Sequence, residues 1–465
     1  MTKSAVEKVI RNKEPKSPRT SLREKALIIG GGIAGIRAAL DIANAGFRVL
    51  LVEKKPTIGG HMAQLAQIFP TMDPATHILT PLMNEVGHHP NIKLLMLSEV
   101  IGVKGCLGNF HIHIKKNPRC VDPDKCDLCK ERMHAQCAEV CPITVPSEFD
   151  EGLTLRKAIY IPFPQAVPST YTIDRDICIS CGKCAQPDVC GPGAVNLADE
   201  EEIIEEDVGV VIVTTGYELY SQENVGEYGA DECPDVITSL QFERMLSTEG
   251  PTAGVPKRPS DGKIPEKIAF IHCAGSRDER HMPYCSNICC TYLAKHAILF
   301  KELVPNGEVY SLYDEFEMEG KNQEYFIKRA QEEAGVNYIR AKVSRIYEQD
   351  GKVKILGVDS LLRKSMEIEV DMAVLALPMV PSHGIKDLAN QMRIEVDEYG
   401  FLREKDPKLR PVESATPGIF IAGCAQTPMD IRSTMAQAGA AATKALEVLT
   451  QMEGAQSREK QWLQM

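Results

Sequence analysis

The sequence lacks the features that would assign it to a membrane, secreted or nucleic-acid-binding class. No apolar run in its 465 residues reaches the roughly 18 to 20 residues of a membrane-spanning helix, so we do not expect an integral membrane protein. Residues 1–25 are polar and basic without the apolar core of a secretory signal, which predicts a tail or partner-contact arm. The net charge of −11 disfavours general nucleic-acid binding, and the acidic stretch 199–207 is expected to be a solvated turn. The length and the ordinary apolar and charged fractions predict a soluble, core-forming chain of two or three domains, and we expect it in the cytoplasm.

Cysteine, in contrast, is abundant. The chain holds 16, and without an export signal their close Cys-x-x-Cys groups indicate metal or clusters rather than structural disulfides. Four cysteines stand apart from these groups, one of them Cys424, which is considered below with the flavoprotein signatures. Cys106 and Cys233 receive no role, whereas Cys120 is interpreted as a buried thiol that could substitute as a ligand.

A strand, a glycine turn and a helix follow one another near the start of the chain. The apolar segment Lys25–Ile29 runs into Gly30-Gly31-Gly32-Ile33-Ala34-Gly35 and then into the helical pattern of Ile36–Ala45. The first glycine permits a tight turn, the third lets backbone N–H groups approach a pyrophosphate, and the last allows close packing of helix on strand. This order predicts a dinucleotide site.

The residues that follow favour FAD over NAD. Glu53 ends the next strand, Arg48–Val52, at the distance where a carboxylate accepts hydrogen bonds from a ribose hydroxyl. Gly59-Gly60 comes soon afterwards, an extension typical of flavoproteins with two dinucleotide-binding domains.

Two later segments resemble further signatures of the same flavoprotein class. Val208–Tyr217 is a buried strand that ends on Thr214-Thr215-Gly216, and Thr416–Gly423 is a strand that ends in glycine. Such enzymes usually place an aspartate next, where this chain has Cys424. The residues expected to contact the cofactor are Gly30, Gly32, Ile33, Ala34, Gly35, Glu53, Lys54, Gly59, Gly60, His61, Val100, Thr215, Gly216, Gly423, Cys424, Gln426, Met435 and Ala436.

Eight cysteines between the glycine turn and Thr215 have the spacing of a two-cluster ferredoxin, in which the last cysteine of each run crosses to the other cluster. One [4Fe–4S] cluster is assigned to Cys126, Cys129, Cys137 and Cys190, and the other to Cys178, Cys181, Cys184 and Cys141. Pro142 after the first run is typical of such domains, although Lys130–Gln136 and Ala185–Val189 lengthen both runs. A pair of zinc knuckles is the alternative, since zinc also takes four thiolates.

Four more cysteines replace an expected glycine turn in the second half of the chain. The apolar strand Lys267–Ile271 would lead into a second nucleotide fingerprint in a nicotinamide-dependent relative, but none follows. A third [4Fe–4S] cluster is therefore expected near the start of the helix Thr291–Leu299. A redox-active disulfide and simple core packing remain alternatives. The ligands would be Cys273, Cys285, Cys289 and Cys290.

Several longer sequence segments resemble one known family specifically. From about Ala26 to Leu449 the chain resembles the A subunit of heterodisulfide reductase, a flavin- and iron–sulfur-containing family with a thioredoxin-reductase-like core and an inserted ferredoxin domain. The strings that carry it are Gly59–Asp73, His89–Leu95, Ser147–Pro168, Val236–Met245 and Gly275–Cys290.

The resemblance implies an electron-transfer subunit in which FAD exchanges an electron pair and passes single electrons to clusters, by flavin-based bifurcation in that family. It also places Lys295 beside flavin N5 as a catalytic residue, with Glu243 as its acidic partner. A cation there would stabilise reduced flavin. Companion subunits and an electron donor or acceptor protein would be its partners.

Three departures from the family pattern bear on bifurcation. Asp73 is followed by Pro74 to His77 rather than cysteines, Met429 stands where the family commonly has a lysine, and the chain ends near the end of the core. These departures weaken bifurcation but leave flavin-to-cluster transfer intact. The alternatives are a self-contained NAD(P)H oxidoreductase resembling the small subunit of glutamate synthase, and a scaffold protein with vestigial sites.

The expected fold is an α/β flavoprotein with two dinucleotide-binding domains, thioredoxin-reductase-like, carrying an inserted bacterial-type ferredoxin domain. The predicted divisions are a tail at 1–24, the first FAD-domain part at 25–117, the ferredoxin insert at 118–200, an FAD-domain continuation and connection at 201–262, the converted nucleotide-binding-like domain at 263–380, the second FAD-domain part at 381–450 and a tail at 451–465.

Overall fold

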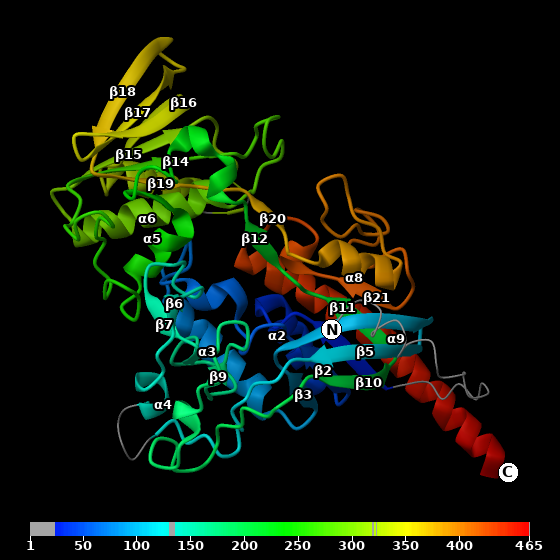
Figure 1. Cartoon of the computed structure of the whole chain (residues 1–465). Helices are drawn as coiled ribbons and strands as arrows, with labels where there is room; N and C mark the ends of the chain where they lie inside the picture. Colours follow the sequence, from blue (N-terminus) through cyan, green and yellow to red (C-terminus); the bar gives the residue numbers. More distant parts are fainter. Residues whose placement is uncertain (1–23, 130–134, 319, 322, 465) are drawn as a thin grey trace.

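The computed structural model describes residues 24–129, 135–318, 320–321 and 323–464, with side chains as far as Met452 (Figure 1). All but the last residue of the tail predicted at 1–24 therefore lies outside the described residues. The tail predicted from residue 451 is instead the continuation of α9 (Ile431–Gln464). Among the described residues, no helix combines the length and the hydropathy that crossing a bilayer requires.

A five-stranded parallel sheet forms the first domain, in the order β21-β11-β1-β2-β3. Its strands are short apolar runs because a parallel sheet is covered on both faces. Helices α2 (Ile33–Asn44) and α9 pack against each other on this domain. The strands are β1 (Lys25–Ile29), β2 (Arg48–Val52), β3 (Ile92–Leu95), β11 (Val210–Val213) and β21 (Ile419–Ile421).

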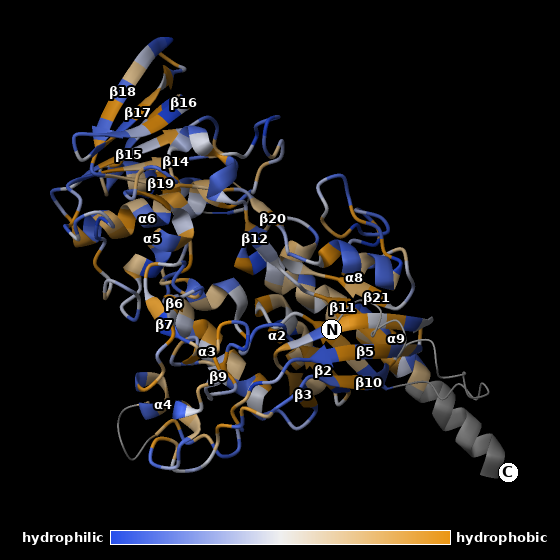
Figure 2. Cartoon of the chain, viewed as in Figure 1, coloured by the Kyte–Doolittle hydropathy of each residue, from blue (hydrophilic) through white to orange (hydrophobic). Residues whose placement is uncertain are grey.

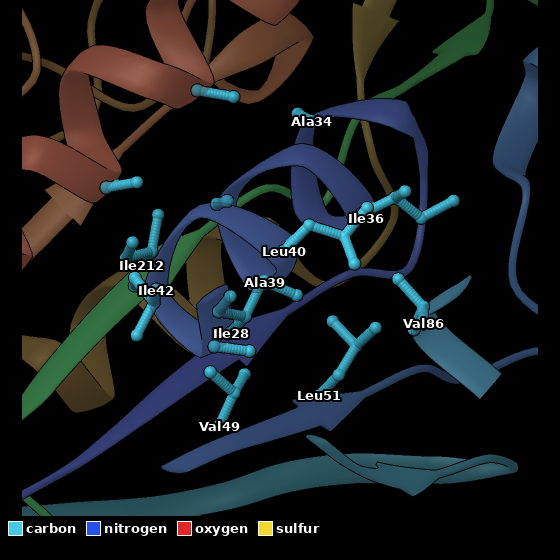
Figure 3. Close-up of a cluster of buried hydrophobic side chains, with 14 of the residues drawn as sticks. Ile28, Ala34, Ile36, Ala39, Leu40, Ile42, Val49, Leu51, Val86 and Ile212 are labelled. Atoms are coloured by element: carbon cyan, nitrogen blue, oxygen red, sulfur yellow. The ribbon is translucent and has the colours of Figure 1, made fainter. Parts of the chain in front are cut away.

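The core of this domain lies between the sheet and α2. Ile36, Ile42 and Leu51 are fully buried, and Val86 reaches the same core from α3 (Ala75–His88) (Figure 3). Each such side chain contributes about 1.5–3 kcal/mol relative to exposure. The core fixes the N-terminus of α2 against the carboxyl ends of β1 and β11.

A three-stranded antiparallel sheet, β10-β5-β4, covers the other side. It consists of β4 (Ser98–Cys106), β5 (Asn109–Lys116) and β10 (Glu202–Val208). The prediction of a solvated turn at 199–207 is wrong for most of that stretch, because β10 pairs with β5. Glu206 pairs with Lys25 and Lys93, and Lys115 lies 3.0 Å from Glu201, so lysines on other elements compensate the acidic run.

A seven-stranded sheet builds the second domain, in the order β13-β19-β14-β15-β16-β17-β18. The strands β16, β17 and β18 mix hydrophobic and hydrophilic residues along their length (Figure 2), whereas β14 and β19 are apolar and mostly buried. The strands are β13 (Val236–Thr238), β14 (Lys267–Ile271), β15 (Glu308–Tyr313), β16 (Asn337–Gln349), β17 (Lys352–Asp359), β18 (Lys364–Val370) and β19 (Met372–Leu375), and the helices are α5 (Ser239–Leu246), α6 (Cys289–Leu303) and α7 (Gln323–Glu332).

The two domains are joined by the antiparallel pair β12 (Tyr217–Leu219) and β20 (Met379–Pro381), after which α8 (Ile385–Met392) returns to the first domain (Figure 1). The range 201–262, predicted as an FAD-domain continuation and connection, contains this crossing. It supplies β11 to the first sheet, but β13 and α5 to the second. β13 belongs to the second sheet because it pairs in parallel with β19. The local sequence contains no pattern that predicts this pairing.

The insert at 118–200 contains little regular structure, and cysteines make up much of its core. Its ends meet where Val121 bridges Val195. Its Asp150 binds Arg244 of α5 with Oδ1 and Nε 2.9 Å apart, so the insert also contacts the second domain. The regular elements are α4 (Gln136–Glu139), β6 (Thr144–Pro146), β7 (Leu155–Lys157), β8 (Ile159–Tyr160) and β9 (Thr172–Ile173).

Candidate functional site

A cavity of about 690 Å³ opens where the first sheet, α5 and α6 meet. A second cavity of about 640 Å³ shares Lys54, Lys55 and Gly60 with the first, so the two form one extended groove. Strand ends of a parallel sheet and a helix N-terminus are the usual surroundings of a dinucleotide.

Glycines shape the phosphate end of this groove. Gly30 has a φ of +105°, and a Cβ there would lie 2.3 Å from the carbonyl oxygen of Thr214. Gly32 begins α2 and faces Gly60, where a Cβ would lie 2.9 Å from the Gly32 Cα. The helix N-terminus is therefore open to a ligand, and its unpaired N–H groups suit a pyrophosphate.

Glu53 stands in the wall of the groove at the end of β2. Its Oε2 accepts a hydrogen bond from the Gly31 N–H at 2.6 Å, and its Oε1 accepts one from the Lys55 N–H at 2.8 Å. Each carboxylate oxygen keeps a lone pair, so the side chain is oriented and still able to accept from ribose hydroxyls.

The structure brings most of the predicted cofactor residues to this cavity. Those that line it are Gly30, Gly32, Ile33, Ala34, Glu53, Lys54, Gly60, His61, Thr215, Gly216 and Cys424. Those outside its lining are Gly35, Gly59, Val100, Gly423, Gln426, Met435 and Ala436.

The residues outside the lining have structural contacts instead. A Cβ at Gly35 would meet the Gly30 carbonyl oxygen at 1.9 Å, so this glycine allows close packing of helix on strand. Val100 is buried in β4, and Gln426 is held by Pro411 and Gln437. On α9 the cavity is lined by residues of the first turn, Ile431, Arg432 and Thr434.

Cys424 occupies the place of the usual aspartate and is a poor substitute for it. Burial raises the pKa of this thiol to about 11, so it stays uncharged at neutral pH. Sequence analysis missed Asp430, which also lines the cavity and whose Oδ1 accepts from the Ser433 N–H at 2.7 Å. The feature of the sequence that could have identified Asp430 is its position just before the helix α9.

Lys295 and Glu243 meet at the opposite wall of the cavity. The Lys295 Nζ donates to Glu243 Oε2 at 2.6 Å, to Oε1 at 2.8 Å and to the Gln67 carbonyl oxygen at 2.7 Å. Burial alone would raise the pKa of Glu243, but Lys295 and His296 lower it well below its usual range. The site therefore holds a carboxylate and an ammonium next to the cavity.

His296 completes this group and was missed by sequence analysis. Its Nε2 lies in hydrogen-bond contact with Glu243 Oε2, while its Nδ1 is buried without a partner among the described residues. Its ring packs against Phe242 and Tyr292 at centroid distances of 5.2 and 5.6 Å. Burial lowers the pKa of His296 despite the carboxylate, so the neutral ring donates from Nε2.

His61 links the cavity to the insert. Its Nδ1 lies 2.8 Å from Gln64 Oε1, and its Nε2 lies 3.0 Å from the Tyr217 carbonyl oxygen. The Gln64 amide donates in turn to Glu151 at 2.8 Å. Burial lowers the pKa of His61.

The four cysteines of the second domain lie together at the N-terminus of α6. Burial, followed by the neighbouring thiols, raises the pKa of Cys273 to about 12 and that of Cys289 well above its usual range. All four are free thiols. Such a group needs a metal or cluster to stay deprotonated.

Hydrogen-bond donors around these thiols also fit a cluster. The Asn287 N–H donates to Cys285 Sγ at 3.3 Å. Arg277, whose charge acts on Cys273 and Cys290, keeps a buried Nη1 without a hydrogen-bond partner in the part of the chain that the structure describes, as does the Ser276 hydroxyl. The Arg277 Nη1 also lies 3.9 Å from Glu317 Oε1. Buried donors without a hydrogen-bond partner suit the sulfur atoms of an iron–sulfur cluster.

In the insert the eight cysteines lie around two enclosed hollows of about 20 Å³ each. One is lined by Cys126, Cys129, Cys137 and Cys190, and the other by Cys141, Cys178, Cys181 and Cys184. The structure thus groups the same quartets that the spacing predicts. Four thiolates around each hollow could hold either an iron–sulfur cluster or a zinc ion. Cys120 is buried outside both hollows.

The fold and the groove define a thioredoxin-reductase-like flavoprotein with two dinucleotide-binding domains. The T. acidophilum thioredoxin reductase matches with a TM-score of 0.51 and 15% identity, covering 92% of this chain and 98% of that one. The Lactococcus lactis enzyme matches with a TM-score of 0.52 and 14% identity, covering 92% and 100%. Residues 26–140 match the family model of FAD dependent oxidoreductase. The predicted flavoprotein fold is confirmed.

Sequence relatives then identify the family. An iron–sulfur A subunit of the Methanopyrus kandleri CoB–CoM heterodisulfide reductase is 46% identical over 453 residues, covering 96% of this chain and 67% of that one. An Archaeoglobus profundus protein named for its likeness to the heterodisulfide reductase A subunit is 42% identical, covering 94% and 68%. The chain belongs to the A-subunit family of heterodisulfide reductases. It spans 64% of the A subunit of the Methanothermobacter marburgensis H(2):CoB-CoM heterodisulfide,ferredoxin reductase, at 46% identity.

Proposed function

We propose that this chain is the electron-transfer subunit of a heterodisulfide-reductase-like complex in the cytoplasm. FAD would occupy the extended groove, and three [4Fe–4S] clusters would occupy the three cysteine quartets. Bound FAD supplies the conversion between electron pairs and single electrons, and the clusters supply one-electron steps.

A single observation carries this proposal: α6 bears both the cavity cation and two of the four cysteines of the second domain, Cys289 and Cys290. Cys289 begins the helix and Lys295 lies six residues further, which is about 9 Å along the axis at 1.5 Å per residue. One rigid helix therefore sets the separation between the two centres. A nicotinamide-binding turn would have to occupy the place where Cys273 follows β14.

The residues around the groove have separate tasks. Gly32 and the α2 N-terminus would bind the pyrophosphate, and Glu53 would hold the ribose. Lys295, fixed by Glu243, would place a positive charge at the reacting edge of the flavin and favour its reduced, anionic form. His296 would keep Glu243 oriented.

The names of the relatives suggest which molecules exchange electrons with the complex. They contain the words CoB–CoM heterodisulfide, ferredoxin and H(2). We infer that companion subunits provide the disulfide-reducing site and that electrons leave through the insert. Bifurcation of the electron pair would require flavin potentials shifted apart, which the Lys295–Glu243 pair could support even with Met429 in place of a lysine.

Anaerobic purification followed by cofactor analysis tests the proposal. We expect one FAD and about twelve irons per chain, the sum of three four-iron clusters. About eight irons per chain would mean that one of the three proposed clusters is absent, about four irons would contradict the two-cluster insert, and zinc in place of iron would overturn the iron–sulfur assignment. Affinity purification from the native organism under argon would then identify the companion subunits.

A further inference from the structure

The groove continues past Glu53 into the second cavity, which lies between the first domain and the insert. Lys54 and Lys55 line both cavities, so the residues just after Glu53 stand where one cavity passes into the other. The adenosine ribose of FAD is bonded to the pyrophosphate on one side and to adenine on the other. A dinucleotide with its pyrophosphate at the α2 N-terminus and its ribose at Glu53 therefore extends its adenine end into the second cavity.

Residues of the insert form one wall of the second cavity. Two of them have flat side chains, Arg156 of β7 and Tyr160 of β8. The Arg156 guanidinium lies over the Tyr160 ring, with Cζ 4.0 Å from the ring centroid. Its Nη2 donates to Asp174 Oδ2 at 2.7 Å, and the Glu148 carboxylate accepts from the same guanidinium. These hydrogen bonds occupy the edge of the guanidinium and leave its faces for stacking.

The strand that carries Tyr160 also encloses the cysteine hollows of the insert. Ile159, its neighbour on β8, lines both hollows. Tyr160 pairs with Thr172 of β9, and both line the second cavity. This arrangement follows from strand geometry, because successive side chains point to opposite faces and directly paired ones to the same face. β8 is therefore a wall shared by the cavity and the two cysteine quartets.

Hydrogen bonds hold the insert against the opposite wall of the cavity. The Val167 N–H donates to Thr57 Oγ1 at 2.9 Å, and the Ile58 N–H donates to the Val167 carbonyl oxygen at 3.1 Å. The Arg119 Nη2 donates to the Pro56 carbonyl oxygen at 2.6 Å. The second cavity therefore has its shape only while the insert is packed on the first domain.

We propose that the insert completes the FAD site, with the adenine ring in the second cavity stacked on the flat wall of Tyr160 and Arg156. Aromatic rings and guanidinium planes both stack on a base, and neither needs a hydrogen bond to its edge. The insert is then a binding element as well as a carrier of clusters, since Ile159 faces the cysteines from the same strand. The inference rests on the proposed function, because it requires FAD in the groove.

Removing the ring of Tyr160 tests this role. In the full chain with its clusters in place and its FAD removed, we expect Tyr160→Leu to bind FAD about tenfold more weakly. ADP carries the adenine end without the flavin, and it should compete with FAD about tenfold less well in this variant. Flavin fluorescence measures both affinities.

Two variants serve as controls. Tyr160→Phe keeps the ring and should bind FAD and ADP normally. The exposed Tyr325 on α7 provides Tyr325→Leu, which makes the same substitution far from the groove in sequence and should also bind both normally. An equal loss in either control, or a loss for FAD without a matching loss for ADP, would overturn the inference.

The possible failures can be told apart. A wild-type chain that binds no FAD contradicts the proposed function, whereas normal affinities in Tyr160→Leu contradict only the role of the insert. If Tyr160→Leu loses iron, Arg156→Lys decides, because it keeps a positive charge beside Asp174 and removes the flat guanidinium. Weaker binding of FAD and ADP by Arg156→Lys supports the inference, and unchanged binding rejects it.

Discussion

Lys295 and Glu243 form an ion pair at the cavity wall, with Nζ and Oε2 2.6 Å apart and each side chain 2% exposed. The two residues come from α6 and α5, and the Ala66 N–H also donates to the carboxylate at 2.8 Å. Because both charges are buried, the stability of the ion pair depends on its close geometry. Removal of the Lys295 cation would leave the Glu243 carboxylate buried without a compensating charge.

Removing one partner of the Lys295–Glu243 pair should lower the free energy of unfolding more than removing both charges. Lys295→Gln leaves Glu243 buried without its cation, which typically costs about 3–5 kcal/mol. We expect a clear fall in Tm, with a substantial part restored by the double variant Lys295→Gln/Glu243→Gln. Thermal unfolding of the anaerobic holoprotein measures this. Lys301→Gln, further along α6, is the control, and a double variant no more stable than Lys295→Gln would contradict the pairing.

The carboxylate of Glu53 should determine affinity for FAD. Glu53→Gln removes an acceptor for the ribose and weakens the bond from the Gly31 N–H, and hydrogen bonds to charged groups contribute about 1.5–3 kcal/mol. We therefore expect FAD affinity to fall by about tenfold to a hundredfold. Titration of the apoprotein with FAD, followed by flavin fluorescence, measures it. The exposed Glu85 on α3 provides the control variant Glu85→Gln, which should bind FAD normally.

The two quartets of the insert should lose iron independently. Cys129→Ser removes a ligand of one and Cys184→Ser a ligand of the other, and each should lower iron by about four atoms per chain. Cys120→Ser should keep the full content, since Cys120 lies outside both hollows. Iron analysis with electron paramagnetic resonance distinguishes the outcomes. Loss of iron from all three centres in either ligand variant would argue against separate quartets.

Acid should destabilise the protein through His296. Burial lowers the pKa of this ring below the ordinary value of about 6.5, so the unfolded chain binds the proton more readily. Stability is therefore complete above about pH 6.5 and falls as the pH drops toward the lowered folded pKa. Between about pH 7.5 and 5.5 we expect His296→Gln to show a shallower fall in Tm than the wild type. The exposed His88 supplies the control His88→Gln, which should follow the wild-type profile.

Reduced nicotinamides should not reduce the flavin. Cys273 and its neighbours occupy the place of the second glycine turn, so the sequence after β14 offers no phosphate-binding turn. We expect NADH or NADPH alone to leave the flavin absorbance unchanged under anaerobic conditions, while dithionite bleaches it. Rapid bleaching by either nucleotide would favour the stand-alone oxidoreductase.

Local sequence patterns were sufficient for the glycine turn and the cysteine quartets. Each depends on residues close together in the chain, as in the turn from Gly30 to Gly35, or on ligand spacings typical of ferredoxins. The position of β13 in the second sheet and the strand β10 were not predicted, because pairing with β19 and β5 stabilises them. Backbone pairing between distant segments produces no recognisable pattern in the local sequence.

The sequence by itself determined the family, the flavin fingerprint and the identity of the twelve grouped cysteines, because covalent spacing and side-chain chemistry are sufficient for these. The tertiary structure alone decided that His296 contacts Glu243 and that Asp430 reaches the cavity. Burial and distance control hydrogen bonds and pKa, and both arise only when α5, α6 and the first sheet pack together.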